Sequence, residues 1–209
     1  MKPAAIFKDG MILQRNKTNR IWGTVIDEEH ISLSFSGKKY TAVIENNIWY
    51  VDIEPHEAGG PYTLEIKSDI SGNMIIDDIL FGEVWLAGGQ SNMELELQNS
   101  ADGKNVCKRE NNDRIRFYNV PKYAKVDDKL LELEEQTKWK KAKPDDLLDV
   151  SAVGFYFAKK LYEKLNVPVG IIDCYWGGTS ATCWFSRDKI KSIPEATDYI
   201  KEWDDVISQ

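Results

Sequence analysis

The sequence of 209 residues predicts an α/β protein in two parts. Residues 1–76 are expected to form an antiparallel β-sandwich, and residues 77–209 part of a mostly parallel sheet with helices on both faces. Two observations support this division. Apolar and polar residues alternate with period two up to residue 76, and strand and helix patterns alternate after it. The length agrees, because at about 150 residues per domain the chain holds one domain and a fraction of another.

The first part has the pattern of short, half-buried strands. Residues 31–35 alternate apolar side chains with serine, and residues 48–53 alternate in the same way. The polar residues 45–47 predict a hairpin turn between strands 39–44 and 48–53. Another strand is expected after the turn signal Gly59-Gly60-Pro61. Strands that recur about every ten residues are typical of an antiparallel β-sandwich.

The second part alternates strands with helices. Strands are expected at 81–87, 115–120 and 167–174, and a helix at 152–165 with Ser151 as its N-cap. Strand–helix–strand units of this kind predict parallel pairing. The apolar stripe of the helix is expected to consist of Val153, Phe157, Leu161 and Leu165.

Composition excludes several classes of protein. Hydrophobic residues make up 42% of the chain and charged residues 29%, as in ordinary globular proteins, so disorder and coiled coil are excluded. The 27 basic and 34 acidic residues leave a net charge of -7, which argues against nucleic acid as a partner. The sequence has no apolar run of about 20 residues and no apolar leader, so we expect no membrane partner and a cytoplasmic location.

The cysteines and the most charged stretch carry no functional signal. Cys107, Cys174 and Cys183 are odd in number and lack Cys-x-x-Cys spacing, so neither a disulfide framework nor a zinc site is expected. A reducing compartment fits this usage. Residues 122–149 are expected to form a solvated surface with one short helix at about 130–136.

The sharpest chemical feature is the segment Gly88-Gly89-Gln90-Ser91-Asn92-Met93-Glu94, a glycine turn that follows a predicted parallel strand. Open α/β sheets bind ligands at this edge. Ser91 is expected to expose its hydroxyl there, and its backbone N–H at a helix N-terminus would favour a developing oxyanion. The alternative is structural, because Ser91 and Glu94 also fit a capping box that needs no catalysis.

Eight segments together resemble the sialate O-acetylesterase family of carbohydrate esterases, in the order in which the family carries them. The resemblance implies an SGNH-type hydrolase domain, with three α/β/α layers, behind an N-terminal β-domain. It also implies hydrolysis of acetyl esters on sugar hydroxyls through an acyl-serine, without a metal or organic cofactor. The segments are Asp9-Gly10-Met11-Ile12-Leu13-Gln14-Arg15, Ile21-Trp22-Gly23, Ala58-Gly59-Gly60-Pro61-Tyr62, Leu80-Phe81-Gly82-Glu83-Val84-Trp85-Leu86, Gly89-Gln90-Ser91-Asn92-Met93, Ser151-Ala152-Val153-Gly154, Val167-Pro168-Val169-Gly170-Ile171-Ile172 and Trp176-Gly177-Gly178-Thr179.

The resemblance assigns roles to individual residues. Ser91 takes the place of the nucleophile and contributes its backbone N–H to the oxyanion hole, and a second N–H comes from Gly178 or Gly177. From the residues alone, Gly177-Gly178 is also consistent with a plain strand-to-helix turn capped by Thr179 or Ser180. Five further motif residues are expected to order the loops or approach the substrate: Gly89, Gln90, Asn92, Trp176 and Thr179.

The sequence lacks part of what such an esterase needs. The resemblance places an aspartate–histidine pair and an oxyanion asparagine in later segments that do not match here, and Thr182 stands where the family often has glutamate. The histidines, His30 and His56, fall in the predicted β-domain and are expected to be surface residues rather than a catalytic base. The sequence predicts only three strands of a sheet of about five.

Three hypotheses follow. The chain is the N-terminal part of an acetylesterase and inactive alone, or it is one chain of a split enzyme completed by another polypeptide. The third hypothesis is a carbohydrate-binding or interaction module with a relic serine motif. The acetylated sugar, sialic acid or a xylan-type unit, is left open at this stage.

Overall fold

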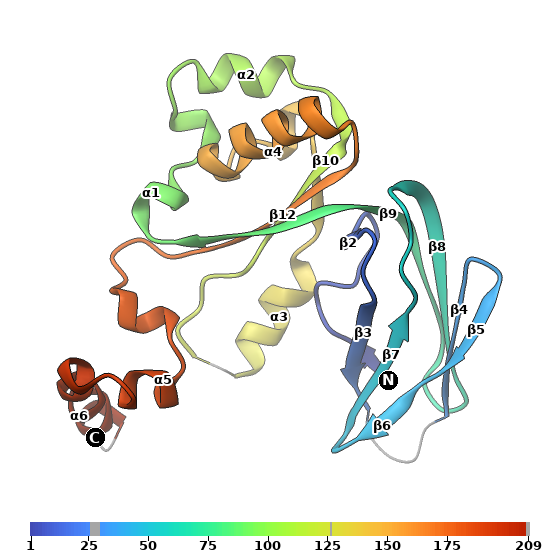
Figure 1. Ribbon diagram of the computed structural model, residues 1–209, viewed down its shortest axis with the longest axis horizontal. Coiled ribbons are helices and arrows are strands. Elements are labelled where there is room, and N and C mark those ends of the chain that lie inside the picture. Colours follow the sequence, from blue (N-terminus) through green and yellow to red (C-terminus); the bar gives the residue numbers. More distant parts are fainter. Residues whose placement is uncertain (26–29, 126, 208–209) are drawn as a thin grey trace.

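The computed structural model describes residues 1–25, 30–125 and 127–207, and one long strand, β9 (Gly72–Gly89), runs through both of its parts (Figure 1). The first half of β9 pairs antiparallel with β8 (Gly59–Ser68), and its second half pairs parallel with β12 (Val169–Tyr175). The boundary expected at residue 76 falls inside this strand. The α/β class with an N-terminal β-sandwich is confirmed.

The N-terminal part consists of two facing sheets. One has the order β1-β3-β7-β6, and the other contains β2, β4, β5, β8 and the first half of β9. The bounds are β1 (Lys2–Pro3), β2 (Ile12–Gln14), β3 (Asn19–Thr24), β4 (Ile31–Phe35), β5 (Lys38–Thr41), β6 (Val43–Glu45) and β7 (Ile48–Ile53).

The expected hairpin at 39–53 is only half right. β6 and β7 pair around the predicted turn, but the first strand is broken, because β5 pairs with β4 in the opposite sheet. Between them, the N–H of Ala42 bonds to the carbonyl of Ile31. The chain therefore passes from one sheet to the other at Ala42, a change of partner that alternation along a single segment does not encode.

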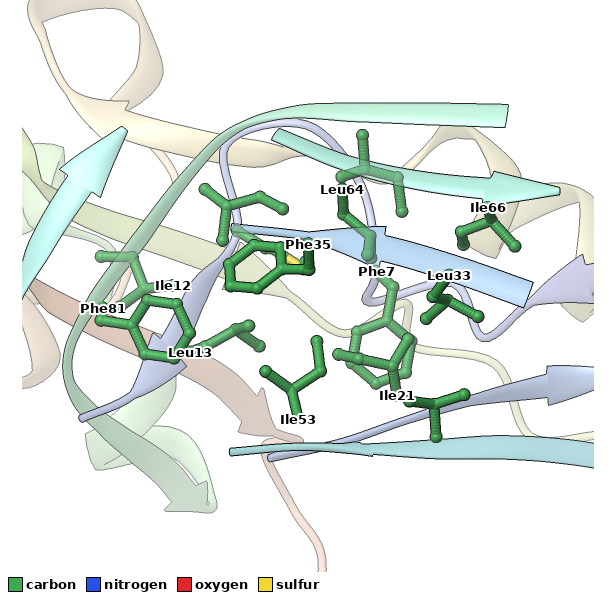
Figure 2. Close-up of a cluster of buried hydrophobic side chains, with 14 of the residues drawn as sticks. Phe7, Ile12, Leu13, Ile21, Leu33, Phe35, Ile53, Leu64, Ile66 and Phe81 are labelled. Atoms are coloured by element: carbon green, nitrogen blue, oxygen red, sulfur yellow. The ribbon is translucent and has the colours of Figure 1, made fainter. Parts of the chain in front are cut away.

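The sandwich core is built from the inward positions of the alternating strands (Figure 2). Leu33 on β4 and Ile53 on β7 are fully buried, with their polar neighbours on the outer faces. Burying one such side chain contributes about 1.5–3 kcal/mol to stability. The side chains labelled in Figure 2 are Phe7, Ile12, Leu13, Ile21, Leu33, Phe35, Ile53, Leu64, Ile66 and Phe81.

The second part is a sheet in the order β11-β10-β12-β9, with β10 (Asn112–Asn119), β12 and the second half of β9 parallel. β11 (Trp139–Ala142) closes one edge in the antiparallel direction. The helices α2 (Gly103–Arg109) and α4 (Ala152–Leu165) lie on one face (Figure 1).

The helix α4 confirms the predicted bounds. Its N-cap is Ser151, whose hydroxyl accepts a bond from the N–H of Gly154 at 3.0 Å. Its C-cap is Asn166 in the left-handed conformation, with φ 52°. Both ends are therefore set by local capping, which explains why the sequence predicts them.

The buried face of α4 differs from the predicted stripe. Val153, Phe157 and Leu165 are 48%, 43% and 43% exposed, and the side that meets the sheet is made of Ala152, Gly154, Phe155 and Ala158. Small residues let the helix approach the sheet: a Cβ at Gly154 would lie 3.3 Å from Ile171. Of the predicted stripe, Leu161 packs against the core, and the other three residues are left on the exposed flank of the helix.

The helix α3 (Asp128–Gln136) lies in the charged stretch, and the N-terminal part of the chain holds its C-terminal end. The ammonium of Lys8 donates to three carbonyls at that end, those of Glu134, Glu135 and Thr137, at 2.7–2.8 Å. Lys2 adds an ion pair with Glu135. This stretch is therefore partly docked rather than only solvated.

The remaining helices are short or lie near the end of the chain, where α5 and α6 stand apart from the sheets (Figure 1). None of the helices in the described ranges combines the length and apolar character needed to cross a bilayer. Their bounds are α1 (Ser91–Glu94), α5 (Arg187–Lys191) and α6 (Thr197–Ile207), with 3-10 turns η1 (Leu97–Asn99), η2 (Pro144–Asp146), η3 (Ala181–Trp184) and η4 (Pro194–Ala196).

Candidate active site

The two motif loops leave the sheet side by side. In the parallel register, Tyr175 at the end of β12 lies opposite Gly89 at the end of β9, and the N–H of Trp176 bonds to the Gly89 carbonyl at 3.0 Å. Gly89 has a φ of 147°, which side chains rarely adopt. The serine motif and the glycine loop are therefore neighbours at the carboxyl edge of the sheet.

Ser91 is exposed at this edge. It is the first residue of α1, and its hydroxyl has one contact in the described structure, with the side-chain oxygen of Gln90 at 3.4 Å. The capping-box alternative is wrong: the N-cap is Gln90, it makes no side-chain cap, and Glu94 bonds elsewhere. Within the described residues, the backbone N–H of Ser91 donates to no acceptor.

Glu94 turns toward the glycine loop. Its Oε2 accepts a hydrogen bond from the N–H of Gly177, and its Oε1 forms an ion pair with Lys122. The Lys122 ammonium, together with the Gly177 N–H, lowers the pKa of Glu94 below its ordinary value even though desolvation opposes this. Glu94 is therefore a carboxylate at neutral pH, and the Gly177 N–H is already engaged.

Gly178, unlike Gly177, lies in open surroundings. Its φ is 80°, a Cβ built on it would meet no atom within 4 Å, and its N–H has no acceptor among the described residues. The N–H groups of Gly178 and Ser91 are thus both unpaired at the same edge of the sheet. Unpaired backbone N–H groups that point toward a reacting carbonyl can stabilise the negative charge that develops on its oxygen.

The other predicted motif residues surround this arrangement. Gln90 and Asn92 are exposed, and Trp176 is 38% exposed, so it is not a core residue. Thr179 orders the loop, since its hydroxyl donates to the Trp176 carbonyl at 2.7 Å and accepts from the indole of Trp184 at 3.0 Å.

The turn after the glycines has only part of the capping that the alternative reading expected. Ser180 is the N-cap of η3 but makes no side-chain cap. Its hydroxyl pairs instead with that of Thr182 at 2.5 Å. The Thr179 hydroxyl bonds in both directions, to the Trp176 carbonyl in the loop and to the Trp184 indole in η3, so it joins the loop to that turn without capping it.

A buried carboxyl lies on β12 at the N-terminal end of α4. Asp173 on β12 is 1% exposed; its Oδ2 accepts from the N–H of Ser151, and its Oδ1 has no partner among the described residues. Burial raises the pKa of Asp173 to about 7. The Ser151 hydroxyl lies 3.5 Å from the sulfur of Met93 in α1, which connects Asp173 to the helix that begins at Ser91.

Sequence reasoning missed three residues of this region. The capping-box pattern does not predict the contact of Glu94 with the glycine loop, the charged composition does not single out Lys122, and the strand pattern gives Asp173 no role. A signal for Asp173 was available, because an acidic residue within a strand expected to be buried on both faces is unusual. No local signal distinguishes Lys122 from the other lysines of the charged stretch.

Both histidines lie far from Ser91. His56 stacks on Phe81, with ring centroids 4.7 Å apart, and eight residues of extended strand, about 26 Å, separate Phe81 from Gly89. His30 pairs with Asp69 at 3.0 Å in the β-domain, with its side chain 91% exposed. Among the described residues, no group of three or more His, Cys, Asp or Glu could hold a metal ion.

Comparison with known proteins places this geometry in a family. Residues 82–203 match the family described as carbohydrate esterase, sialic acid-specific acetylesterase. The chain belongs to this family. The match begins inside β9 and ends within α6, so it includes both the serine motif and the glycine loop.

Individual relatives support this family assignment. Sialate O-acetylesterases from Mus musculus and Homo sapiens are 27% and 28% identical over 93% and 90% of the chain. The crystal structure of a carbohydrate acetylesterase from Xanthomonas citri superimposes with a TM-score of 0.81 at 33% identity, over 91% of this chain and 43% of that one. The chain spans about 40% of the length of the curated relatives.

Proposed function

We propose that this chain supplies the nucleophile and the oxyanion hole of a serine carbohydrate O-acetylesterase. The observation that carries the proposal is the exposed Ser91 hydroxyl on a loop next to the glycine loop, with the N–H groups of Ser91 and Gly178 both without an acceptor among the described residues. Family membership supports the class of reaction. The names of the relatives support an acetylated carbohydrate, sialate or another sugar, as substrate.

The mechanism is acyl transfer to serine. The Ser91 oxygen attacks the acetyl carbonyl while a base takes the hydroxyl proton, and the tetrahedral oxyanion accepts hydrogen bonds from the N–H groups of Ser91 and Gly178. The intermediate collapses, the sugar hydroxyl leaves with a proton from the protonated base, and acetyl-serine remains. Water activated by the same base then releases acetate.

We place the base on polypeptide outside these 209 residues, either a C-terminal continuation or a second chain, because both histidines lie in the β-domain. Two open surfaces support this. Residues 83–89 of β9 pair only with β12 within the described structure, and Trp85 and Leu86 there are 47% and 67% exposed. The exposed α4 stripe borders the same region, since Phe157 contacts Trp85 with ring centroids 5.2 Å apart.

The test compares this chain with the longest natural polypeptide that contains it. Acetate release from p-nitrophenyl acetate, O-acetylated sialic acid and acetylated xylan is measured for both. The longer form is expected to hydrolyse the ester, and Ser91→Ala is expected to abolish hydrolysis without loss of folding, because Ser91 is exposed. Ser32→Ala, an exposed serine on β4, serves as the control. Undiminished acetate release by Ser91→Ala contradicts the proposal.

A second candidate is a carbohydrate-binding module with a relic serine motif. The observation that favours it is the distance of both histidines from Ser91 in the described structure. In that case Ser91→Ala leaves sugar binding unchanged by calorimetry, and no form of the protein releases acetate. Hydrolysis that depends on Ser91 excludes this candidate.

A further inference from the structure

We infer that Glu94 is a positioning residue that locks the glycine loop onto the nucleophile helix and thereby leaves the Gly178 N–H, and not that of Gly177, for the oxyanion. The inference rests on the proposed function for its role in catalysis. The geometry of the contact itself does not depend on that function.

The contacts of Glu94 join three strand ends. Glu94 belongs to α1, which follows β9, whereas Gly177 follows β12 and Lys122 follows β10. Each carboxylate oxygen has its own partner, Oε2 the Gly177 N–H and Oε1 the Lys122 ammonium. Lys122 is held in turn over the Tyr175 ring, with its Nζ 5.4 Å from the centroid. Charge-assisted bonds of this kind are stronger than neutral ones.

The loop needs such a restraint. Two successive glycines have more backbone freedom than any other pair of residues, so without the Glu94 contact the peptide groups around Gly177 could rotate. The bond fixes the direction of the Gly177 N–H toward α1. A donor fixed before the reaction costs no reorganisation when negative charge develops, so a fixed neighbouring Gly178 N–H is more effective than a mobile one.

There is no room for a side chain at the point of contact. A Cβ on Gly177 would lie 2.7 Å from Oε2 of Glu94 and 3.7 Å from the Cα of Ser91. A side chain at position 177 would displace the end of the Glu94 side chain and break this contact, whereas Gly178 has open space and a positive φ. The two positions therefore favour glycine for different structural reasons.

The first measurement follows the Gly177 amide by NMR hydrogen exchange on the ¹⁵N-labelled chain. Glu94→Gln, which keeps an oxygen acceptor but loses the charge, is expected to accelerate Gly177 exchange about tenfold or more. Lys122→Met is expected to accelerate it by a smaller factor. Glu96→Gln is the matched control, since Glu96 is also half-buried but bonds to Gln98 and Asn99. Unchanged Gly177 exchange in Glu94→Gln overturns the inference.

The second measurement uses the longest natural polypeptide that contains the chain. Glu94→Gln is expected to lower kcat for acetate release about tenfold or more, with KM unchanged, because the oxyanion forms only after substrate binds. A rise in KM with unchanged kcat contradicts a positioning role. Failure of the proposed function is distinct: Ser91→Ala would then retain activity, while the exchange of Gly177 still decides whether Glu94 holds the loop.

Discussion

The two glycines after β12 show how a single residue type serves different needs. Gly178→Ala is expected to lose about 1–2 kcal/mol of unfolding free energy, because an alanine at a φ of 80° is strained although space is open. Urea unfolding measures this. Gly37→Ala is the matched control, since Gly37 has a φ of 77° and equally open surroundings.

The two substitutions are expected to differ in their effect on acetate release. Similar losses of stability, with acetate release reduced only by Gly178→Ala, are expected if Gly178 contributes to the oxyanion hole. Equal acetate release by the two variants argues against a role for the Gly178 N–H.

The buried carboxyl of Asp173 predicts a pH dependence of stability. Burial raises its pKa to about 7 in the folded chain, whereas an unfolded chain releases this proton near pH 4. The folded state binds more protons between these values, so the unfolding free energy falls as pH rises through this window and stays low above it. Asp149 strengthens the effect and Lys140 opposes it.

Asp173→Asn should remove this dependence. The amide oxygen still accepts from the Ser151 N–H, so the variant is expected to be more stable than the wild type at pH 8, by at most about 4 kcal/mol, and similar below about pH 4. Urea unfolding at a series of pH values tests this, with the exposed Asp145→Asn as control. A pH profile identical to that of the wild type would show that Asp173 does not titrate in this range.

At the scale of elements, the docking of α3 depends on one side chain. Lys8 donates to three carbonyls at the C-terminal end of α3, of which that of Glu134 also accepts from the N–H of Thr137. Lys8→Met is expected to release this helix, with faster proteolysis between residues 123 and 137 and a loss of about 1–2 kcal/mol. Lys17→Met, at an exposed lysine, is the control. Unchanged proteolysis in Lys8→Met argues against this role.

The elements differ in how far their own residues predict them. The helix α4 is predicted to the residue because Ser151 and Asn166 cap it locally, but the face that it buries is not. The small residues Ala152, Gly154 and Ala158 set that face, because they let the helix approach the sheet closely. A prediction based on large apolar residues such as Phe157 therefore selects the wrong face.

At the scale of the whole molecule, Arg116 ties the two parts together. It lies on β10 and is 2% exposed, and its guanidinium donates to the Gly10 carbonyl at 2.8 Å and to the carbonyl and carboxylate of Asp78 at 2.6 and 2.8 Å. Arg116→Met leaves the Gly10 and Asp78 carbonyls without this donor, while Lys141 still pairs with the Asp78 carboxylate, and is expected to cost about 1–3 kcal/mol. Thermal unfolding measures the loss.

The control is Arg109→Met, since Arg109 forms an exposed ion pair with Asp102 that contributes little. Both parts are expected to unfold in one transition, because β9 belongs to both sheets. Two separate transitions in the wild type would contradict this coupling.

The sequence by itself determined the class of fold and the place of the candidate nucleophile. Period-two alternation, helix caps and a glycine turn are short-range features. Each depends on the backbone and on neighbouring side chains, so the sequence predicts them without knowledge of the fold. Only the tertiary structure decided that Glu94 meets Gly177, 83 residues away, and that the chain changes sheets at Ala42. Such contacts depend on strand order and register, which join residues that no local pattern connects.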